Sequence, residues 1–597
     1  MLRAAATALA LVLAAPAVAA AQSRTQAPPP PCAADSAAHQ AYARLAADFE
    51  AYDRAEDPIT AGFEGDRSAL SRLPDITPAG DARRLAALKA FKARIGARPS
   101  GLCPDDAFNW DFLSRVIDDR IERIGFDEAR LGFDHEGGPY NLLRYLADTT
   151  VIRNREDAEA WLTRLQAVPK LIDDLTANTR RGIKTGFVLP RETVASGLPV
   201  MQADLKTPTD QDPLLAPLTN LPASIPAAER AALQARGRTI LEQGIRPAHQ
   251  RFVTMVEKEY APKARKGLGV GSLPGGQAYY AYLARHFTTT PMTPQEIHDL
   301  GQREVARIRA EMDAVMRETG FKGTFPEFLA FLRSDPQFYA QSREDLMEKA
   351  SEISKRIDDK LPGIFGTLPR LTYGVREVPR AIEENYTTGR YNLGSPQQGI
   401  AGGYMVNTSH LDQRPLYELP ALTLHEAVPG HHLQIALSQE LGEQPWFRRN
   451  ADVTAFIEGW GLYAEFLGYD LGTYRNPYER FGKLSYEMWR ACRLVADTGI
   501  HALGWTLEQA RACFRDNSAL APHNIETELQ RYVAGPGQAL AYKVGELKLR
   551  ELRKRAETAL GPAFDLRLFH DAVLLGGPMP LDMLDARIDA WIAARKK

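Results

Sequence analysis

Three histidines and a glutamate lie close together in the segment Leu424–Gln434, LHEAVPGHHLQ. Histidine nitrogens and carboxylate oxygens are ligands that zinc takes in proteins, and two histidines four residues apart on a helix can reach one ion. Here the residue four places after His425 is Pro429, and the next histidines are His431 and His432. On a regular helix His425 and His431 would point in directions about 240° apart. One ion could bind both only if the helix is interrupted between them.

The dipeptide Pro429-Gly430 provides such an interruption. Proline inside a helix removes a hydrogen bond and clashes with the preceding turn, and glycine accepts unusual backbone angles. Without these two residues the segment reads HEAVHH, in which His431 follows His425 by four. We therefore predict a local bulge that returns His431 to the face of His425. His432 lies two turns from His425, about 10 Å along a regular helix. It is the alternative ligand, or it supports a ligand from behind or contacts the substrate.

A catalytic zinc site needs a third protein ligand and an open position for water. Glu458 is the candidate, because it lies in the apolar segment FIEGWGLYAE on a helix predicted over Ala455–Leu467. A carboxylate on an apolar helix needs a partner, and an arginine is the alternative to the metal. Glu426 is the candidate general base, which would take a proton from zinc-activated water and pass it to a leaving amine. Together these residues predict hydrolysis of an amide bond with Zn²⁺, whereas capping and core histidines are the alternative.

Two further groups of side chains could act on a substrate. The first consists of donors to a tetrahedral oxyanion, which needs a donor besides zinc: Tyr532, Tyr542 and His501. The second consists of cations that could bind a substrate carboxylate: Arg490, Arg493 and Lys543. For any one of these residues, core packing or surface solvation is the alternative explanation.

Helical periodicity predominates in the rest of the chain. Apolar residues recur with the spacing of an amphipathic helix in several segments: Asp81–Ile95, Glu156–Thr176, Ala227–Tyr260, Pro294–Thr319, Thr506–Phe514 and Gly545–Leu560. Pro169 should kink or split the second segment, and Thr293 with Glu296 predicts a capping box at the start of the fourth. The pattern predicts a mainly helical fold.

The segment Leu371–His410 differs, because it is rich in glycine, valine, tyrosine and threonine and lacks helix signals. It predicts a small antiparallel sheet just before the histidines. Gly402, Gly403 and Tyr404 lie in the stretch GIAGGYMVNT, whose uncovered backbone could pair with an extended peptide by strand addition. A hairpin that only packs is the alternative.

The start of the chain has the pattern of an export signal. A positive start, the apolar run Ala4–Ala15 and the small residues Ala19–Ala21 are typical of a cleaved signal peptide. We therefore expect a signal peptide over residues 1–21, a flexible leader over 22–34 and one large domain over 35–597. The protein should be periplasmic or secreted, with no membrane anchor after cleavage.

Charge and cysteine content restrict the partners and the compartment. The 73 basic and 75 acidic residues nearly balance, which argues against nucleic acid or an anionic membrane as the main partner. An even number of cysteines in an oxidising compartment favours disulfides. Proximity along the chain favours the pairs Cys32–Cys103 and Cys492–Cys513, one of three possible pairings, and free buried thiols are the alternative.

Several segments together resemble the bacterial family named domain of unknown function 885. They are HEAVPGHH, EGWGLYAE, DTGIHALGW, RYVAGPGQALAYKVG and LPGGQAYYAY. That family is similar in fold to carboxypeptidase Taq and, more distantly, to angiotensin-converting enzyme. The resemblance implies a zincin-like helical fold with a deep cleft, zinc bound by His425, His431 and Glu458, and Glu426 as the base. The Pro-Gly insertion departs from the HExxH of those peptidases.

The sequence therefore predicts an exported zinc metallopeptidase that hydrolyses peptides, as a carboxypeptidase or a dipeptidase. One alternative is a zinc amidase that acts on cell-wall peptides or other amides. Another is a catalytically inactive helical protein that binds peptides. The sequence predicts neither the side-chain preference nor the oligomeric state.

Overall fold

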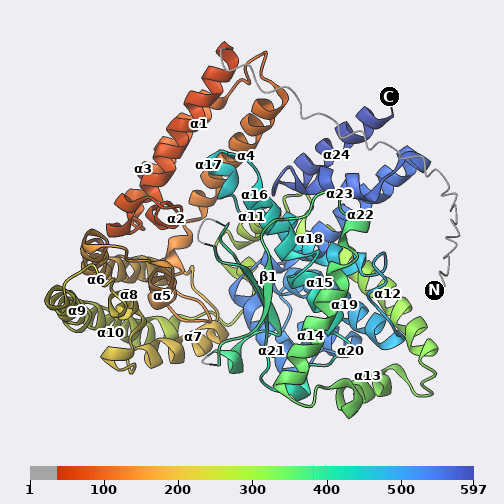
Figure 1. Ribbon diagram of the computed structural model, residues 1–597. Helices are drawn as coiled ribbons and strands as arrows, with labels where there is room; N and C mark the ends of the chain where they lie inside the picture. The colour runs from red at the N-terminus through yellow and green to blue at the C-terminus, as the bar shows by residue number, and fades with distance from the viewer. Residues whose placement is uncertain (1–35, 381, 397–398, 597) are drawn as a thin grey trace, which may run out of the picture.

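The computed structural model describes residues 36–596, except residues 381, 397 and 398. The predicted signal peptide and leader lie outside the described residues. The first part of the described chain is helical (Figure 1). Its helices are α1 (Ala37–Glu56), α2 (Pro58–Phe63), α3 (Pro78–Ile95), α4 (Pro104–Phe126), α5 (Pro139–Thr149), α6 (Arg155–Thr185), α7 (Arg191–Asp204), α8 (Ala216–Thr219), α9 (Ala227–Ile240) and α10 (Arg246–Met255).

The remaining helices surround a small sheet near the middle of the chain. Before the sheet come α11 (Gly276–Thr288), α12 (Pro294–Glu318), α13 (Phe325–Ser334) and α14 (Arg343–Asp358). After it come α15 (Leu419–Glu426), α16 (His431–Glu440), α17 (Trp446–Arg449), α18 (Thr454–Leu467), α19 (Pro477–His501), α20 (Leu507–Asn517), α21 (Pro522–Ala534), α22 (Ala541–Leu560), α23 (Leu566–Leu574) and α24 (Leu581–Arg595).

The mainly helical prediction is confirmed, and most predicted helices lie within a few residues of the observed ones. The capping box of Thr293 and Glu296 is present at the start of α12. The segment predicted over Ala227–Tyr260 is helical throughout, with π-helical turns after α9 and after α10. Pro169 does not split its helix, since α6 continues through it. Because α6 packs against both α9 and α10, its tertiary contacts outweigh the hydrogen bond lost at proline.

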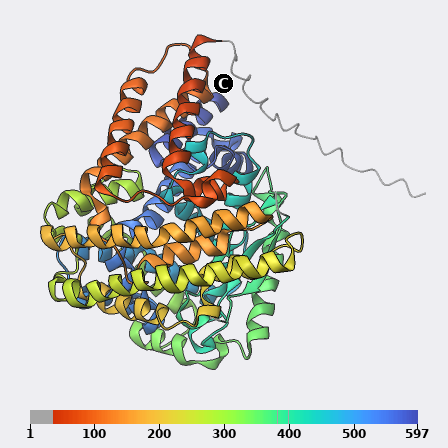
Figure 2. The same cartoon turned by 90° about the vertical axis from the view of Figure 1, so that its left-hand side faces the viewer.

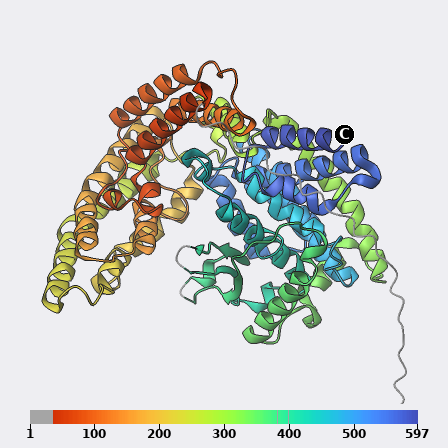
Figure 3. The ribbon, with the colours of Figure 1, turned by 45° about the horizontal axis from the view of Figure 1, so that its top comes forward.

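Two apolar cores organise the described residues. The larger core draws side chains from the N-terminal helices, the sheet and the C-terminal helices, whereas residues 133–264 enclose a separate core. Figure 2 shows α6 and the helices α9 and α10 side by side across one face of the molecule. In Figure 3 the helices α6–α10 lie on one side and α19–α24 on the other. No helix in the described part of the chain is both long and apolar enough to cross a membrane.

The sheet is mixed, not antiparallel as predicted. It consists of β1 (Tyr373–Glu377), β2 (Gly389–Asn392) and β3 (Gly402–Val406) in the order β1-β3-β2. Strand β3 pairs parallel with β1 and antiparallel with β2. The predicted strand addition at Gly403 and Tyr404 is therefore wrong, because β3 is central and both of its edges are already paired. The Tyr404 side chain is buried, with its hydroxyl 3.2 Å from Thr423 Oγ1.

Candidate metal centre

The chain breaks between the two histidines that the sequence predicts as ligands. Helix α15 ends at Glu426 and α16 begins at His431, so the predicted bulge inside one helix is in fact a turn between two helices. Gly430 is required at this turn, because a Cβ there would lie 1.9 Å from the His425 carbonyl oxygen. The Trp460 indole N–H donates to the Pro429 carbonyl oxygen at 2.7 Å. These contacts fix the turn and thereby the direction in which α16 leaves it.

The turn brings His431 back beside His425, as predicted. The two rings are nearly perpendicular, with centroids 4.7 Å apart. Glu458 on α18 completes the group: its Oε2 lies 3.6 Å from His425 Nε2 and 3.4 Å from His431 Nε2. Helix α18 can come this close because Gly461 faces the His425 ring, where a Cβ would lie 2.6 Å from Cε1. Three helices thus direct one potential ligand atom each toward a common point.

The donor set fits a zinc ion. The ligand atoms of His425, His431 and Glu458 all lie within 4.8 Å of one another. Atoms bound to one tetrahedral zinc at about 2.0–2.1 Å are about 3.4 Å apart, close to the two distances from Glu458. Its Oε2 is buried and makes no hydrogen bond within the described structure, and such an atom needs a partner. Burial would raise the pKa of Glu458, but His431 and His425 hold it well below its usual value.

His425 is oriented by a buried carboxylate that the sequence analysis did not assign. Its Nδ1 donates to Glu465 Oε1 at 2.9 Å, and Arg490 Nη2 lies 3.0 Å from the same oxygen. The Nε2 lone pair is thereby directed at the ligand cluster. Burial lowers the pKa of His425, but the neighbouring carboxylates of Glu458 and Glu465 outweigh it and raise the pKa to about 9, so a bound metal would displace the Nε2 proton. The seven-residue spacing of Glu458 and Glu465, two helical turns, was the signal that could have revealed this role.

The predicted substrate contact at Arg490 is corrected by this pairing. Its guanidinium is buried, binds Glu465 and donates from Nη1 to the Tyr486 carbonyl oxygen at 3.1 Å. Arg490 therefore pairs with Glu465, and its charge is already matched within the protein. It acts on the candidate metal centre through His425 and not through a substrate.

Glu426, the predicted base, lies at the last position of α15, next to His425. Its Oε2 accepts a hydrogen bond from the Tyr391 backbone N–H of β2 at 2.8 Å. The sheet therefore fixes the position of the carboxylate. This contact was not predicted, because no sequence pattern shows which strand faces which helix end.

His432 is neither a ligand nor a substrate contact. Its Nε2 donates to the Leu371 carbonyl oxygen at 3.1 Å. Its Nδ1 accepts a hydrogen bond from the Tyr391 hydroxyl, which is 3.1 Å away. Burial lowers its pKa to about 4, so the ring is neutral. Both nitrogens join α16 to the sheet, and the choice between the adjacent histidines falls on His431.

Two of the predicted oxyanion donors are fully engaged in the core. The Tyr532 hydroxyl accepts from Trp489 Nε1 and Arg493 Nε and donates to Glu528. His501 accepts from the Val270 N–H and donates to the Tyr532 carbonyl oxygen, and burial lowers its pKa to about 3. Neither side chain has a donor left for a substrate.

Tyr542 is the predicted oxyanion donor that lies by the cluster. Burial and the nearby Glu458 carboxylate raise its pKa, so the hydroxyl keeps its proton. Its hydroxyl makes one long contact, 3.4 Å from Gln538 Nε2. Arg493 lies beside it, with its guanidinium carbon 4.3 Å from the ring centroid.

The predicted substrate role of Lys543 is not supported by its surroundings. Its side chain is completely buried, and its ammonium contacts Glu487 at 2.7 Å, Glu304 at 3.2 Å and Glu546. These carboxylates belong to a buried ion cluster that joins α12, α19 and α22. These carboxylates balance the charge of Lys543, so the position of its side chain is explained without a substrate.

One predicted disulfide is confirmed. Cys492 and Cys513 are bonded, with Cα atoms 5.7 Å apart, and join α19 to α20. Because Cys492 lies between Arg490 and Arg493 on α19, the bond anchors the helix that carries both arginines. Cys32 lies outside the described residues, so its pairing with Cys103 stays a prediction.

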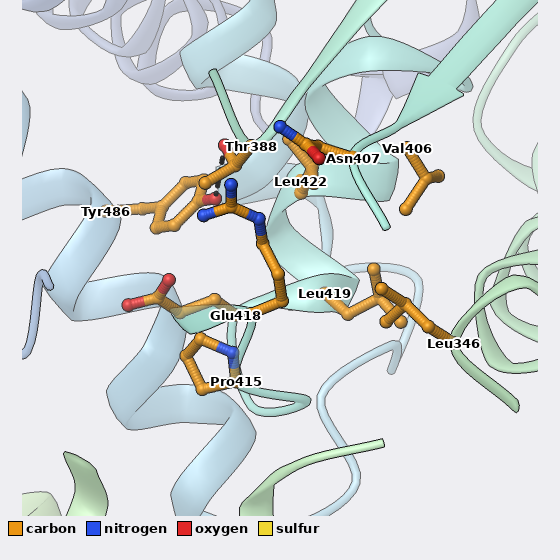
Figure 4. Close-up of a pocket in the computed structure, with 10 residues that line it drawn as sticks. Leu346, Thr388, Val406, Asn407, Pro415, Glu418, Leu419, Leu422 and Tyr486 are labelled. Carbon is orange, nitrogen blue, oxygen red and sulfur yellow. Dashed lines mark hydrogen bonds between the residues drawn. The ribbon is translucent and has the colours of Figure 1, made fainter. Parts of the chain in front are cut away.

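A small cavity lies beside the first turn of α15, and none of the three candidate ligands lines it. Its volume is about 20 Å³, and its lining includes Glu418, Tyr486, Thr388 and Leu422 (Figure 4). This volume holds about one water molecule. Glu418 Oε1 is buried there without a hydrogen-bond partner in the described structure. Burial raises the pKa of Glu418 to about 8, although Arg490 opposes the rise.

The fold and the site define a mainly helical protein whose broken helix gathers two histidines and a glutamate as candidate metal ligands. Residues 58–588 match the family described as bacterial protein of unknown function (DUF885), and the chain belongs to that family. The resemblance to this family is therefore confirmed. No curated protein matches the chain.

Two solved structures share the fold over nearly their whole length. A protein from Colwellia psychrerythraea is 26% identical, with a TM-score of 0.86, over 94% of this chain and all of its own. A protein from Shewanella oneidensis is 19% identical, with a TM-score of 0.71, over 91% of this chain and 99% of its own. Each is described as a "putative lipoprotein", the second of unknown function. At its low identity, the second shows likeness of fold alone.

Proposed function

We propose that this protein is a zinc-dependent peptidase that hydrolyses a peptide bond. The observation that carries the proposal is the convergence of His425 Nε2, His431 Nε2 and the unpaired Glu458 Oε2 within 4.8 Å. Glu426 stands next to the first of these ligands in the chain. Two neutral histidines and a carboxylate form the ligand type of many catalytic zinc sites.

Each residue around the cluster has a separate task. When bound, zinc would acidify a water molecule and polarise the substrate carbonyl. Glu426 would accept the proton released by the attacking water and deliver it to the leaving amine. Glu465 keeps the Nδ1 proton on His425, so that Nε2 stays free as a ligand atom. Tyr542, which keeps its phenolic proton, would donate to the developing oxyanion.

Two further considerations support the proposal. The motifs that resemble domain of unknown function 885 include the residues that form the cluster, and the similarity in fold to carboxypeptidase Taq that this resemblance implies favours the same zinc ligands. The signal pattern of residues 1–21 and the description of the Colwellia psychrerythraea relative as a "putative lipoprotein" support an exported protein. We accordingly place the substrate, a peptide, outside the cytoplasm.

The adjacent histidines allow a matched test of the metal site. We expect purified protein to bind about one zinc per chain, the His431→Ala variant to lose most of it, and the His432→Gln variant to retain it. Metal content after dialysis measures this directly. A His431→Ala protein that retains a full equivalent of zinc would contradict the ligand assignment.

The Glu426→Gln variant tests the chemistry separately from metal binding. We expect it to retain zinc and to hydrolyse peptides about 10²–10⁴-fold more slowly. Hydrolysis is followed by the release of free amines from a peptide mixture. Unchanged rates would exclude Glu426 as the base, and zinc-loaded wild-type protein that cleaves no peptide would leave a peptide-binding protein or a different amide as substrate.

A further inference from the structure

Arg493 lies on α19, where its guanidinium is held in place but one of its hydrogen-bond donors has no partner within the described structure. The side chain is 4% exposed. Its guanidinium packs against two aromatic rings, with Cζ 4.6 Å from the Trp489 ring centroid and 4.3 Å from that of Tyr542. These contacts fix the plane of the guanidinium before any ligand arrives.

The hydrogen bonds of Arg493 leave one nitrogen unpaired. Nε donates to the Tyr532 hydroxyl at 2.8 Å, and Nη2 donates to Glu528 Oε2 at 3.0 Å. Nη1 is buried and has no partner among the described residues. A buried, charged donor without an acceptor is unfavourable, so this nitrogen is suited to donate a hydrogen bond to an anionic ligand.

Charge around Arg493 is also unbalanced. Glu528 is the single carboxylate in contact with Arg493 within the described structure, and Arg531 Nη2 contacts the same Oε2 at 2.9 Å. Two guanidinium groups therefore share one carboxylate, and Arg531 Nη1 turns to the neutral Gln538. Arg493, Arg531, Glu528 and Gln538 together carry one net positive charge around the buried Arg493, which one additional anion would neutralise.

Tyr542 connects this surplus charge to the candidate metal centre. Helices α18 and α22 cross in close contact, since a Cβ on Gly459 would lie 2.5 Å from the Gly545 Cα. Glu458 precedes this crossing by one residue, and Tyr542 precedes it by one helical turn on the other helix. Tyr542 therefore lies near the crossing that carries Glu458, and its ring contacts the Arg493 guanidinium.

We propose that Arg493 Nη1 binds the C-terminal carboxylate of a peptide substrate, so that the enzyme requires a free C-terminus. This inference rests on the proposed peptidase function, because it places the carboxylate beside Tyr542, whose helix crosses the helix of Glu458. A carboxylate fits the site because it accepts from Nη1 and supplies the missing negative charge. A peptide amide offers the acceptor without the charge.

Binding to the Glu426→Gln variant loaded with zinc tests this subsite without turnover. The probes are N-acetyl-trialanine as the free acid and as the C-terminal amide, titrated by calorimetry. We expect the acid to bind at least about tenfold more tightly, as a charge-assisted hydrogen bond to a buried arginine implies. Adding Arg493→Gln should reduce the acid-to-amide ratio to within about twofold, and Arg493→Lys should restore part of it.

Arg309→Gln is the matched control in the same background. Arg309 is also a stacked arginine, 3.4 Å from the Phe325 ring centroid and paired with Asp313 on α12. This variant should keep the full acid-to-amide ratio. If Arg493→Gln does not fold, the comparison is made with Arg493→Lys, and equal affinities for the two peptides on the Glu426→Gln protein still overturn the subsite.

The outcomes separate this inference from the proposed function. Equal affinity for acid and amide, no binding of either peptide, or a ratio that survives Arg493→Gln would overturn the carboxylate subsite. A strong acid preference without any hydrolysis by the wild-type protein would overturn the peptidase and leave the subsite standing. Hydrolysis of acid and amide at equal rates would support the peptidase and overturn the subsite.

Discussion

Two adjacent histidines show how far the chemistry of this protein is decided by single side chains. His431 faces His425 and Glu458, whereas His432 binds the sheet through both ring nitrogens. Residue type and position in the chain are almost the same for both. The two histidines differ in the direction that the first turn of α16 gives to their side chains after the break. The contacts of each side chain, and not the residue type, therefore define the site.

Glu465 should control metal affinity although it is not a ligand. Its Oε1 accepts a hydrogen bond from His425 Nδ1 and forms an ion pair with Arg490. Glu465→Gln keeps the shape but removes the charge, and we expect zinc affinity to fall about 10–100-fold. Competition with a chromophoric chelator measures the affinity. Glu479→Gln, an acidic residue in the first turn of α19, is the control, and equal affinities for both variants would contradict the role of Glu465.

Glu418 should make the folded state less stable as the pH rises. Burial raises its pKa from the ordinary value of 4.5 to about 8. Between these values the folded state keeps a proton that the unfolded state releases, so the free energy of unfolding falls by up to about 1.4 kcal/mol per pH unit. This contribution is complete below about pH 4.5 and is lost as the pH rises through about 8.

The neutral variant Glu418→Gln isolates this contribution. We expect its free energy of unfolding, measured with urea between about pH 5 and about pH 8, to fall less steeply with pH than that of the wild type. The difference between the two proteins is the measured quantity, because other groups titrate equally in both. Parallel pH profiles would show that Glu418 titrates normally.

At the scale of elements, the centre depends on how closely α18 approaches α15. Gly461 permits that approach, because a methyl group there would lie 2.6 Å from His425 Cε1 and 2.9 Å from Nε2. Gly461→Ala should therefore displace the imidazole and weaken zinc binding by at least about tenfold. Gly442→Ala is the control, since nothing lies within 4 Å of its added Cβ.

The comparison of these two variants has a clear negative outcome. If Gly461→Ala binds zinc as tightly as Gly442→Ala, the His425 ring is not confined by α18. Circular dichroism of both variants should show the wild-type helix content, because alanine favours helices and the clash is confined to one side chain. Loss of helix in Gly461→Ala would mean that the glycine serves packing as a whole.

The sequence predicted elements better than partners. The helix boundaries, the capping box at Thr293 and the return of His431 follow from local patterns, which proline, glycine and apolar spacing determine. The roles proposed for Tyr532, His501 and Lys543 failed because their partners lie on other helices. Val270, for example, contacts His501 across 231 residues of sequence. The mixed order of the sheet was missed for the same reason, since β2 lies between β1 and β3 in sequence but not in space.

For the whole molecule, the candidate centre joins three helices within the larger of two apolar cores. Zinc should therefore stabilise the folded protein, because the ligands converge only when α15, α16 and α18 are packed. At a zinc concentration about one hundred times the dissociation constant, the gain is about 2.7 kcal/mol. Thermal unfolding with zinc and with a chelator measures the shift, and the His431→Ala variant should show little difference between the two conditions. An equal shift in that variant would place the stabilising ion elsewhere.

The turn between α15 and α16 has one more consequence, for the choice of ion. In a motif carried by a single helix, the backbone hydrogen bonds of that helix fix the separation of the two histidines. Here the separation depends on four residues, Ala427 to Gly430, and on the indole of Trp460, which donates a hydrogen bond to the carbonyl oxygen of Pro429. A substitution in this turn can widen or narrow the cage without altering a ligand or a helix. We therefore expect substitutions in this loop, which supplies no candidate ligand, to change the preference of the proposed site among cations of different radius.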